Sequence, residues 1–236
     1  PELGGVADRF PARSATPLGR IVNDYIALFE RFRDEPPAPE RAPYPADPRR
    51  LANELKANCH FLNATLAGCC AIPPSAWTGA PIAGQGHALV VVVEFGRDPE
   101  PGSLAAGWVR GSEYDCALLR AAEIALISAS FLRRLGFPAT AHARDRGDVC
   151  HAQLLVAAGL AWADGEAPFI GRRYASCVVT TAEPLAAVDI LVAAPRPVHH
   201  GVLGGRLVLA VGHALHDVLE AREIVAMTDQ DGVVHR

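Results

Sequence analysis

The chain has 236 residues, of which 50% are hydrophobic and 20% charged, a balance that is typical of globular proteins and excludes an intrinsically disordered chain. A formal net charge of −4 at pH 7 gives no reason to expect nucleic acid or an anionic membrane surface as a partner. No uninterrupted apolar stretch reaches the length of about 18 residues that a membrane-spanning helix needs, so we expect no membrane span.

Residues 1–46 predict an N-terminal arm that contains one short helix. The segment "RIVNDYIALFERFR" (20–33) has apolar residues at helical spacing and predicts an amphipathic helix. Six prolines in residues 34–50 predict an extended linker after it. We therefore expect the helix to be an appendage that packs on another surface or on a second copy of the chain, as in a homodimer. Its expected apolar face consists of Ile21, Tyr25, Leu28 and Phe29.

The main body is expected to span residues 47–190. It opens with a helix, because Asp47 can cap the helix and Pro48 suits its first position. A short strand, "CCAI", follows this helix. The segment "HALVVVVEF" (87–95) is continuously apolar and rich in β-branched residues, which predicts a central strand covered on both faces.

Residues 113–135 predict the longest helix, which ends at Gly136 and is apolar over most of its circumference. The strand expected next, 139–143, consists almost wholly of small side chains. Two interpretations remain open. Either something wide and flat approaches the backbone of this strand, or the strand packs beneath the helix. A further helix is expected after Asp148 and a further strand over 176–185.

Residues 191–236 form a C-terminal extension without a clear pattern. His213 and His216 could share one helical face, but no third zinc ligand is evident, and a solvated polar face is the preferred interpretation. No metal site is predicted. The six cysteines form no C-x-x-C pair, which favours a reduced, cytoplasmic protein without an iron–sulfur motif.

One long run resembles a known family. "LRAAEIALISASFLRRLGFPATAHARDRGDVCHAQLLVAAGLAWADGEAPFIGRRYASCVVTTAEPL" is similar, almost without gaps, to the corrinoid-binding core of reductive dehalogenases. The matching phrases are Phe131–Ala139, Ala157–Ala161, Gly171–Arg173 and Thr181–Leu185. The resemblance implies an α/β fold over residues 47–190. More narrowly, it implies a nitroreductase-like α/β/α sandwich, with one central sheet and helices on both faces.

The resemblance also implies a site. In this family the strand after the helix lies beside a flat corrin ring, which would explain the small side chains of residues 139–143. The implied cofactor-binding residues for a cobalamin are Ala139, Thr140, Ala141, His142, Arg144 and Tyr174. The catalytic candidates are Tyr114 and Arg173, as proton donor and supporting cation, although Leu118 stands at the position where the family has its tyrosine.

The family's iron–sulfur cysteines have no counterpart, because residues 186–236 contain no cysteine. A separate iron–sulfur or flavin reductase would then have to supply electrons. Two alternatives stay open. One is a catalytically degenerate scaffold or interaction domain that keeps the fold without a cofactor. The other, less favoured, is a flavin-dependent nitroreductase-like enzyme. Whether the chain is an enzyme therefore remains undecided at this point.

Overall fold

The computed structural model describes residues 3, 5–43, 47–144, 147–164, 167–171, 173–182 and 185. Contacts divide the chain into two compact units, Pro1–Val192 and Ala193–Arg236. The second unit, and with it the predicted C-terminal extension with His213 and His216, lies outside the described residues.

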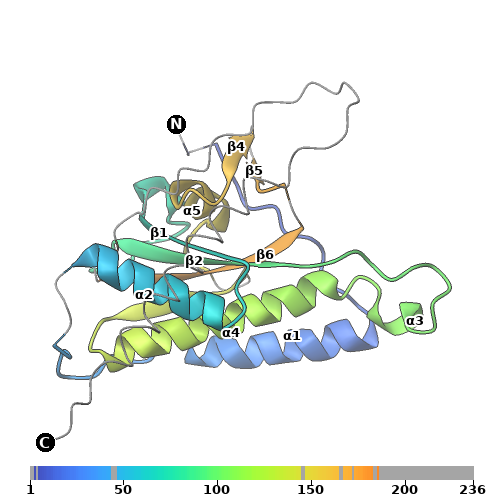
Figure 1. Ribbon diagram of the computed structural model, residues 1–236, viewed down its shortest axis with the longest axis horizontal. Coiled ribbons are helices and arrows are strands. Elements are labelled where there is room, and N and C mark those ends of the chain that lie inside the picture. Colours follow the sequence, from blue (N-terminus) through green and yellow to red (C-terminus); the bar gives the residue numbers. More distant parts are fainter. Residues whose placement is uncertain are drawn as a thin grey trace, which may run out of the picture. The chain divides into compact units, whose positions relative to one another are not determined.

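A four-stranded sheet with the order β1-β2-β6-β3 forms its centre, and all neighbouring strands are antiparallel (Figure 1). The strands are β1 (Leu66–Ala71), β2 (His87–Glu94), β6 (Tyr174–Thr181) and β3 (Ala139–His142). β2 pairs along its whole length with β6, in the register His87↔Thr181 to Glu94↔Tyr174. Its six inner residues, 88–93, are all buried. The prediction of a central strand covered on both faces is confirmed.

One face of the sheet carries three helices, α1 (Pro17–Phe29), α2 (Pro48–Phe61) and α4 (Glu113–Arg134). α4 packs directly on the sheet, and α1 runs beside α4 (Figure 1). α4 has acidic residues in its first turn and arginines in its last turn, and these charges complement the helix dipole. The core on this side contains Leu89, Val91, Leu118, Ile124 and Leu132, all with at most 1% of their surface exposed.

In the part of the chain that the structure describes, the opposite face carries one short α-helix, α5 (His151–Ala157). The two-stranded hairpin of β4 (Trp162–Asp164) and β5 (Ala167–Phe169) lies next to it. Here Leu154 and Leu155 of α5 pack on Val90 and Val178 of the sheet. With helices on both faces of one sheet, the expected α/β class is confirmed. The remaining elements are η1 (Glu30–Phe32), η2 (Pro74–Ala76) and α3 (Ala106–Val109).

α1 belongs to this core rather than to an appendage. Val22 and Ile26 are 6% and 1% exposed and join the cluster beneath the sheet. The face that was expected to be buried is largely exposed instead, since Ile21 and Tyr25 keep more than half of their surface and Leu28 keeps 41%. Packing of this exposed stripe on a second copy stays a prediction.

The proline-rich segment does not separate α1 from the main body, because it folds back along the end of α4. The amide of Ala38 donates to the carbonyl of Arg133 at 2.8 Å, and that of Ala42 donates to Leu135 at 3.0 Å. Gly136 makes this crossing possible. It has a φ of 85°, and a Cβ there would come within 2.6 Å of the Glu40 carbonyl.

No helix in the described part of the chain is long and apolar enough to cross a membrane.

Candidate functional site

The small side chains of β3 are explained by helix packing. Ala139 and Ala141 face the cluster that contains α4 and α1, and they are 3% and 8% exposed. Beside Ala141 lies a gap of about 20 Å³ that is bounded by residues of α1 and α4, among them Ile26 and Ala125. The structure therefore favours the second interpretation of the thin strand, in which it lies beneath a helix. This gap is far too small for a corrin ring.

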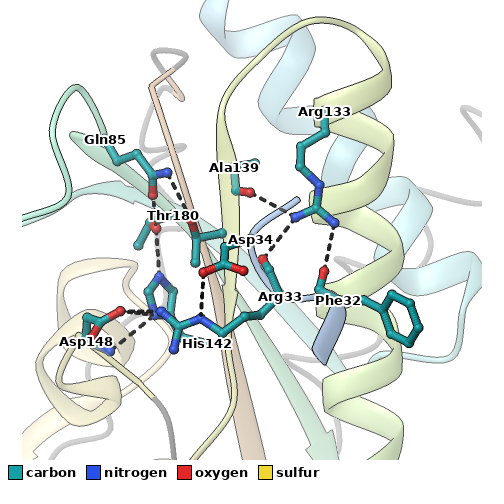
Figure 2. A network of polar contacts seen from close by, with 10 residues as sticks. Phe32, Arg33, Asp34, Gln85, Arg133, Ala139, His142, Asp148 and Thr180 are labelled. Atoms are coloured by element: carbon teal, nitrogen blue, oxygen red, sulfur yellow. Dashed lines mark hydrogen bonds and ion pairs between the residues drawn. The ribbon is translucent and has the colours of Figure 1, made fainter. Parts of the chain in front are cut away.

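The same packing is fixed by a buried arginine of α4. Arg133 is 3% exposed, and its guanidinium donates to the carbonyls of Arg33 and Ala139 at 3.0 Å each and to that of Phe32 at 3.1 Å (Figure 2). It thereby joins α4, η1 and β3. The backbone amide of Ala141 also donates to the Arg33 carbonyl, at 2.9 Å.

The other face of β3 carries a chain of polar side chains centred on His142 (Figure 2). Its Nδ1 accepts from the amide of Asp148 at 3.2 Å, so its Nε2 carries the proton and donates to Thr180 Oγ1 at 2.8 Å. The Thr180 hydroxyl donates to Gln85 Oε1, and the Gln85 amide donates to Thr140 Oγ1 at 3.0 Å.

Burial, and then the nearby Arg33 guanidinium, lower the pKa of His142 to about 3, so the ring is neutral near pH 7. His142 is fully buried and both of its nitrogens are engaged. It has no atom left to offer to a propionamide of a corrin ring, which differs from the role that the resemblance implied. Thr140 is likewise 3% exposed and engaged by Gln85.

A cavity of about 540 Å³ opens at the end of the sheet where β6 begins. Four segments that are far apart in the sequence meet there: the N-terminal arm, the end of β2, and the first turns of α4 and α5. Three of the predicted site residues line this cavity, the catalytic candidates Tyr114 and Arg173 and the cofactor-binding candidate Tyr174. The structure thus brings together residues that are 59 and 60 positions apart along the chain (173 − 114 and 174 − 114).

Aromatic rings and arginines shape the wall of the cavity. Burial raises the pKa of Tyr114 to about 12, against the opposing effect of the Arg144 guanidinium, so its phenol stays protonated near neutral pH. The Arg144 guanidinium lies 5.8 Å from the centre of the Tyr114 ring. Arg173 lies 5.0 Å over the ring of Phe95, and this ring meets Tyr114 edge-on at 5.8 Å.

Two lining residues that the sequence interpretation did not single out have unsatisfied polar atoms. His151 Nδ1 donates to the Ser176 carbonyl at 3.1 Å, which leaves Nε2 as an acceptor, and this buried atom has no partner. Glu113 Oε2 is also buried without a partner. Burial raises the pKa of Glu113, and the neighbouring Asp98 carboxyl group raises it further. Only the fold reveals these atoms, since neither residue belongs to a motif.

Of the other implied site residues, Arg144 lies beside Tyr114 at the cavity wall, and the remaining four lie elsewhere. Ala139 and Thr140 border a second, more open hollow of about 450 Å³, next to Gln85 and the start of the proline-rich segment. Ala141 and His142 are packed inside the domain, as described above. Leu118, at the position where the family has its tyrosine, is completely buried in the core. Within the described residues, no group of three or more His, Cys, Asp or Glu side chains could hold a metal ion.

Among solved structures, this chain is similar to reductive dehalogenases. No family model and no curated protein matches the chain. The solved structure of the catabolic reductive dehalogenase NpRdhA, N-terminally tagged, matches with 39% identity over 77% of this chain and 28% of that one, at a TM-score of 0.66. The same protein in complex with 3-bromo-4-hydroxybenzoic acid matches equally well.

A further reductive dehalogenase structure, which suggests a mechanism for B12-dependent dehalogenation, matches with 39% identity over 78% of this chain at a TM-score of 0.67. The chain is related to the reductive dehalogenases, as its sequence predicted. It spans about 28% of the length of the structures that it matches.

Proposed function

We propose that this chain is a reductive dehalogenase-like domain that binds a corrinoid in the cavity at the end of the sheet. The observation that carries the proposal is the 39% identity, over more than three quarters of the chain, with reductive dehalogenases, one of them described as B12-dependent. In this proposal a separate electron-donating module, with an iron–sulfur cluster or a flavin, supplies the electrons. Residues 186–236 themselves contain no cysteine that could ligate a cluster.

The residues of the cavity suit the periphery of a corrinoid, which carries carboxamide side chains. Glu113 Oε2 and His151 Nε2 are buried acceptors without partners, and an amide N–H would satisfy either of them. Arg173 and the phenol of Tyr174 offer hydrogen-bond donors from the same wall. The volume of about 540 Å³ is that of a site for a drug-sized ligand, so it holds only part of a corrinoid while all of its walls stay in place.

Tyr114 is the residue that would handle a proton. A raised pKa of about 12 keeps the proton on Oη near neutral pH, where the phenol can donate it to a developing negative charge. The neighbouring Arg144 guanidinium favours the phenolate that would remain. When bound, a corrinoid supplies a redox-active cobalt at which a carbon–halogen bond can be reduced.

A second candidate function is a scaffold or interaction domain that retains the fold without a cofactor. Two observations favour it. Leu118 is a core residue where the family has a tyrosine, and helices fill the space beside β3 that the resemblance assigns to the ring. Since either function is compatible with the same fold, the decision rests on cofactor binding itself.

The test is purification of the chain in the presence of hydroxocobalamin, followed by a visible spectrum and a calorimetric titration. Retention of the red corrinoid absorbance, with saturable heat, is the expected result. A colourless protein that gives no heat with either oxidised or reduced cobalamin would establish the scaffold. A yellow protein as isolated would point to a flavin instead.

A further inference from the structure

The segment that precedes α1, residues 6–15 and here called the arm, forms one wall of the cavity. Residues Asp8 to Ala12 all line it, and from residue 6 to residue 15 the chain contains no helix or strand. The arm nevertheless holds a defined path, because side chains and backbone groups of the domain bind it at several points. Its role in the site follows from these contacts.

The first half of the arm is bound to the start of α5. The Asp8 carboxylate accepts from the backbone amides of Ala152 at 2.7 Å and His151 at 3.1 Å, two amides of the first turn that have no partner within the helix. The carbonyl of Val6 accepts from the Gln153 side chain at 3.1 Å and lies 3.6 Å from the thiol of Cys150. Val6 itself is 3% exposed.

The second half is bound by residues around Tyr114. The ring of Phe10 meets His151 edge-on at 5.8 Å, and the Arg144 guanidinium lies 5.2 Å over the same ring. Arg144 also donates to the carbonyl of Pro11 at 2.6 Å. Further along, the amide of Ser14 donates to Asp115 at 2.7 Å. The arm thus engages His151 and Arg144, which would otherwise face the site.

We infer that the arm is an intramolecular occupant of the corrinoid site, and that it must move away before the cofactor can seat fully. This inference rests on the proposed function. The cavity holds only part of a corrinoid while the arm forms its wall. Within the described residues, Asp8 to Ala12 are the longest run of lining residues outside helices and strands; Phe95, Asp98, Gly111 and Arg173 are the other lining residues outside them. A segment without helix or strand that is held by a few polar contacts opens locally at a lower cost in free energy than packed helices and strands do.

Occupation by the arm sets the affinity of the site. If only the fraction of molecules with a detached arm can bind, the apparent dissociation constant rises in inverse proportion to that fraction. Contacts that hold the arm should therefore weaken corrinoid binding, and their removal should strengthen it. An ordinary pocket wall behaves in the opposite way, since its removal weakens binding.

A disulfide can lock the arm in place. Val6→Cys would set a second thiol beside the native Cys150, whose Sγ already lies 3.6 Å from the carbonyl of residue 6. The oxidised variant should bind hydroxocobalamin at least about tenfold more weakly than the same variant after reduction. The matched control is Val6→Cys combined with Cys150→Ser, in which oxidation forms no link and should change nothing.

Removal of the Asp8 cap loosens the arm without a lock. Asp8→Ala should strengthen hydroxocobalamin binding several-fold, because the lost cap favours the detached state. The matched control is Asp47→Ala, which removes a similar cap at α2, where the Asp47 side chain accepts from the amide of Arg49 at 2.9 Å. This control should leave the affinity unchanged.

The outcomes separate the inference from the proposed function. Equal affinity of the locked and reduced forms, or weaker binding by Asp8→Ala than by the Asp47→Ala control, would overturn the inference and leave corrinoid binding intact. Absence of binding by the parent, the reduced variant and Asp8→Ala together would overturn the proposed function. Binding by Asp8→Ala alone would support both, with the arm as the reason that the parent resists uptake.

Discussion

His142 shows how one buried residue links the pH of the solution to the stability of the domain. Its ring is fully buried, and its two nitrogens connect Asp148 to Thr180, which continues to Gln85. Because burial and the Arg33 guanidinium disfavour the imidazolium, the pKa in the folded state is about 3, well below the ordinary value of 6.5. The unfolded chain therefore binds a proton that the folded chain does not.

We expect the free energy of unfolding to fall as the pH falls from about 6.5 towards 3, and to be independent of this group above about pH 7. The loss attributable to His142 is on the order of a few kcal/mol over that window. Urea denaturation between pH 4 and pH 8 measures it. His142→Gln should flatten the dependence, whereas His60→Gln, on an exposed residue of α2, should not. Parallel slopes for the parent and His142→Gln would contradict this account.

Arg133 is the second residue whose role is structural. It satisfies three backbone carbonyls at the junction of α4, η1 and β3. Arg133→Met should cost about 2–4 kcal/mol in the free energy of unfolding, since buried carbonyls lose their partners. Arg134→Met, on the exposed neighbouring position, should stay within about 0.5 kcal/mol of the parent. Chemical denaturation measures the free energy of unfolding of both variants. If the two arginines acted only on the dipole of α4, both variants would lose the same amount of stability.

At the scale of elements, β3 is narrow because helices lie against it. Ala139 and Ala141 allow α4 and the end of α1 to approach the edge of the sheet, and the gap that remains beside Ala141 is about 20 Å³. A larger side chain has no space to enter. The strand and the two helices therefore depend on each other, and a change of volume at this point affects all three.

Ala141→Trp should destabilise the domain by about 1–3 kcal/mol or more, because an overfilled core forces its neighbours apart. Thermal unfolding measures the effect. Ala27→Trp, on the exposed face of α1, is the matched control and should leave the unfolding temperature nearly unchanged. If Ala141→Trp kept full stability but lost hydroxocobalamin uptake, the strand would border a ligand after all.

At the scale of the whole molecule, the N-terminal segment is part of the folded unit. Deletion of residues 1–46 would remove Val22 and Ile26 from the core and uncover α4. Each of these side chains contributes roughly 1.5–3 kcal/mol through burial. We expect the truncated chain to lose its cooperative thermal unfolding transition. Circular dichroism during heating measures this transition. Deletion of residues 1–5 should leave the transition unchanged. A truncated chain that unfolds like the parent would show that α1 is dispensable.

The sequence by itself determined the fold class and the longest elements, but not the hairpin of β4 and β5 or the short helix α3. The β-branched run of β2 requires burial on both faces wherever it lies, and the capping and periodicity of α4 are local properties. The phrases around Phe131–Ala139 and Thr181–Leu185 also identified the relationship to reductive dehalogenases, because order and spacing along one chain need no coordinates. The fold class and the family could both be predicted for this reason.

Only the tertiary structure decided which site residues meet. Tyr114, Arg173 and Tyr174 line one cavity because antiparallel pairing brings the start of β6 beside the end of β2 and the first turn of α4. His142 and Ala141 were assigned to a ligand from their place in the chain, but burial engages one in hydrogen bonds and packs the other beneath α1.

Asp8 and His151 belong to no sequence motif. They lie together at the site because the arm packs against the start of α5, where Asp8 accepts from the amide of His151. Contacts between residues so far apart in the sequence depend on tertiary packing, which the local pattern of apolar and polar residues does not specify.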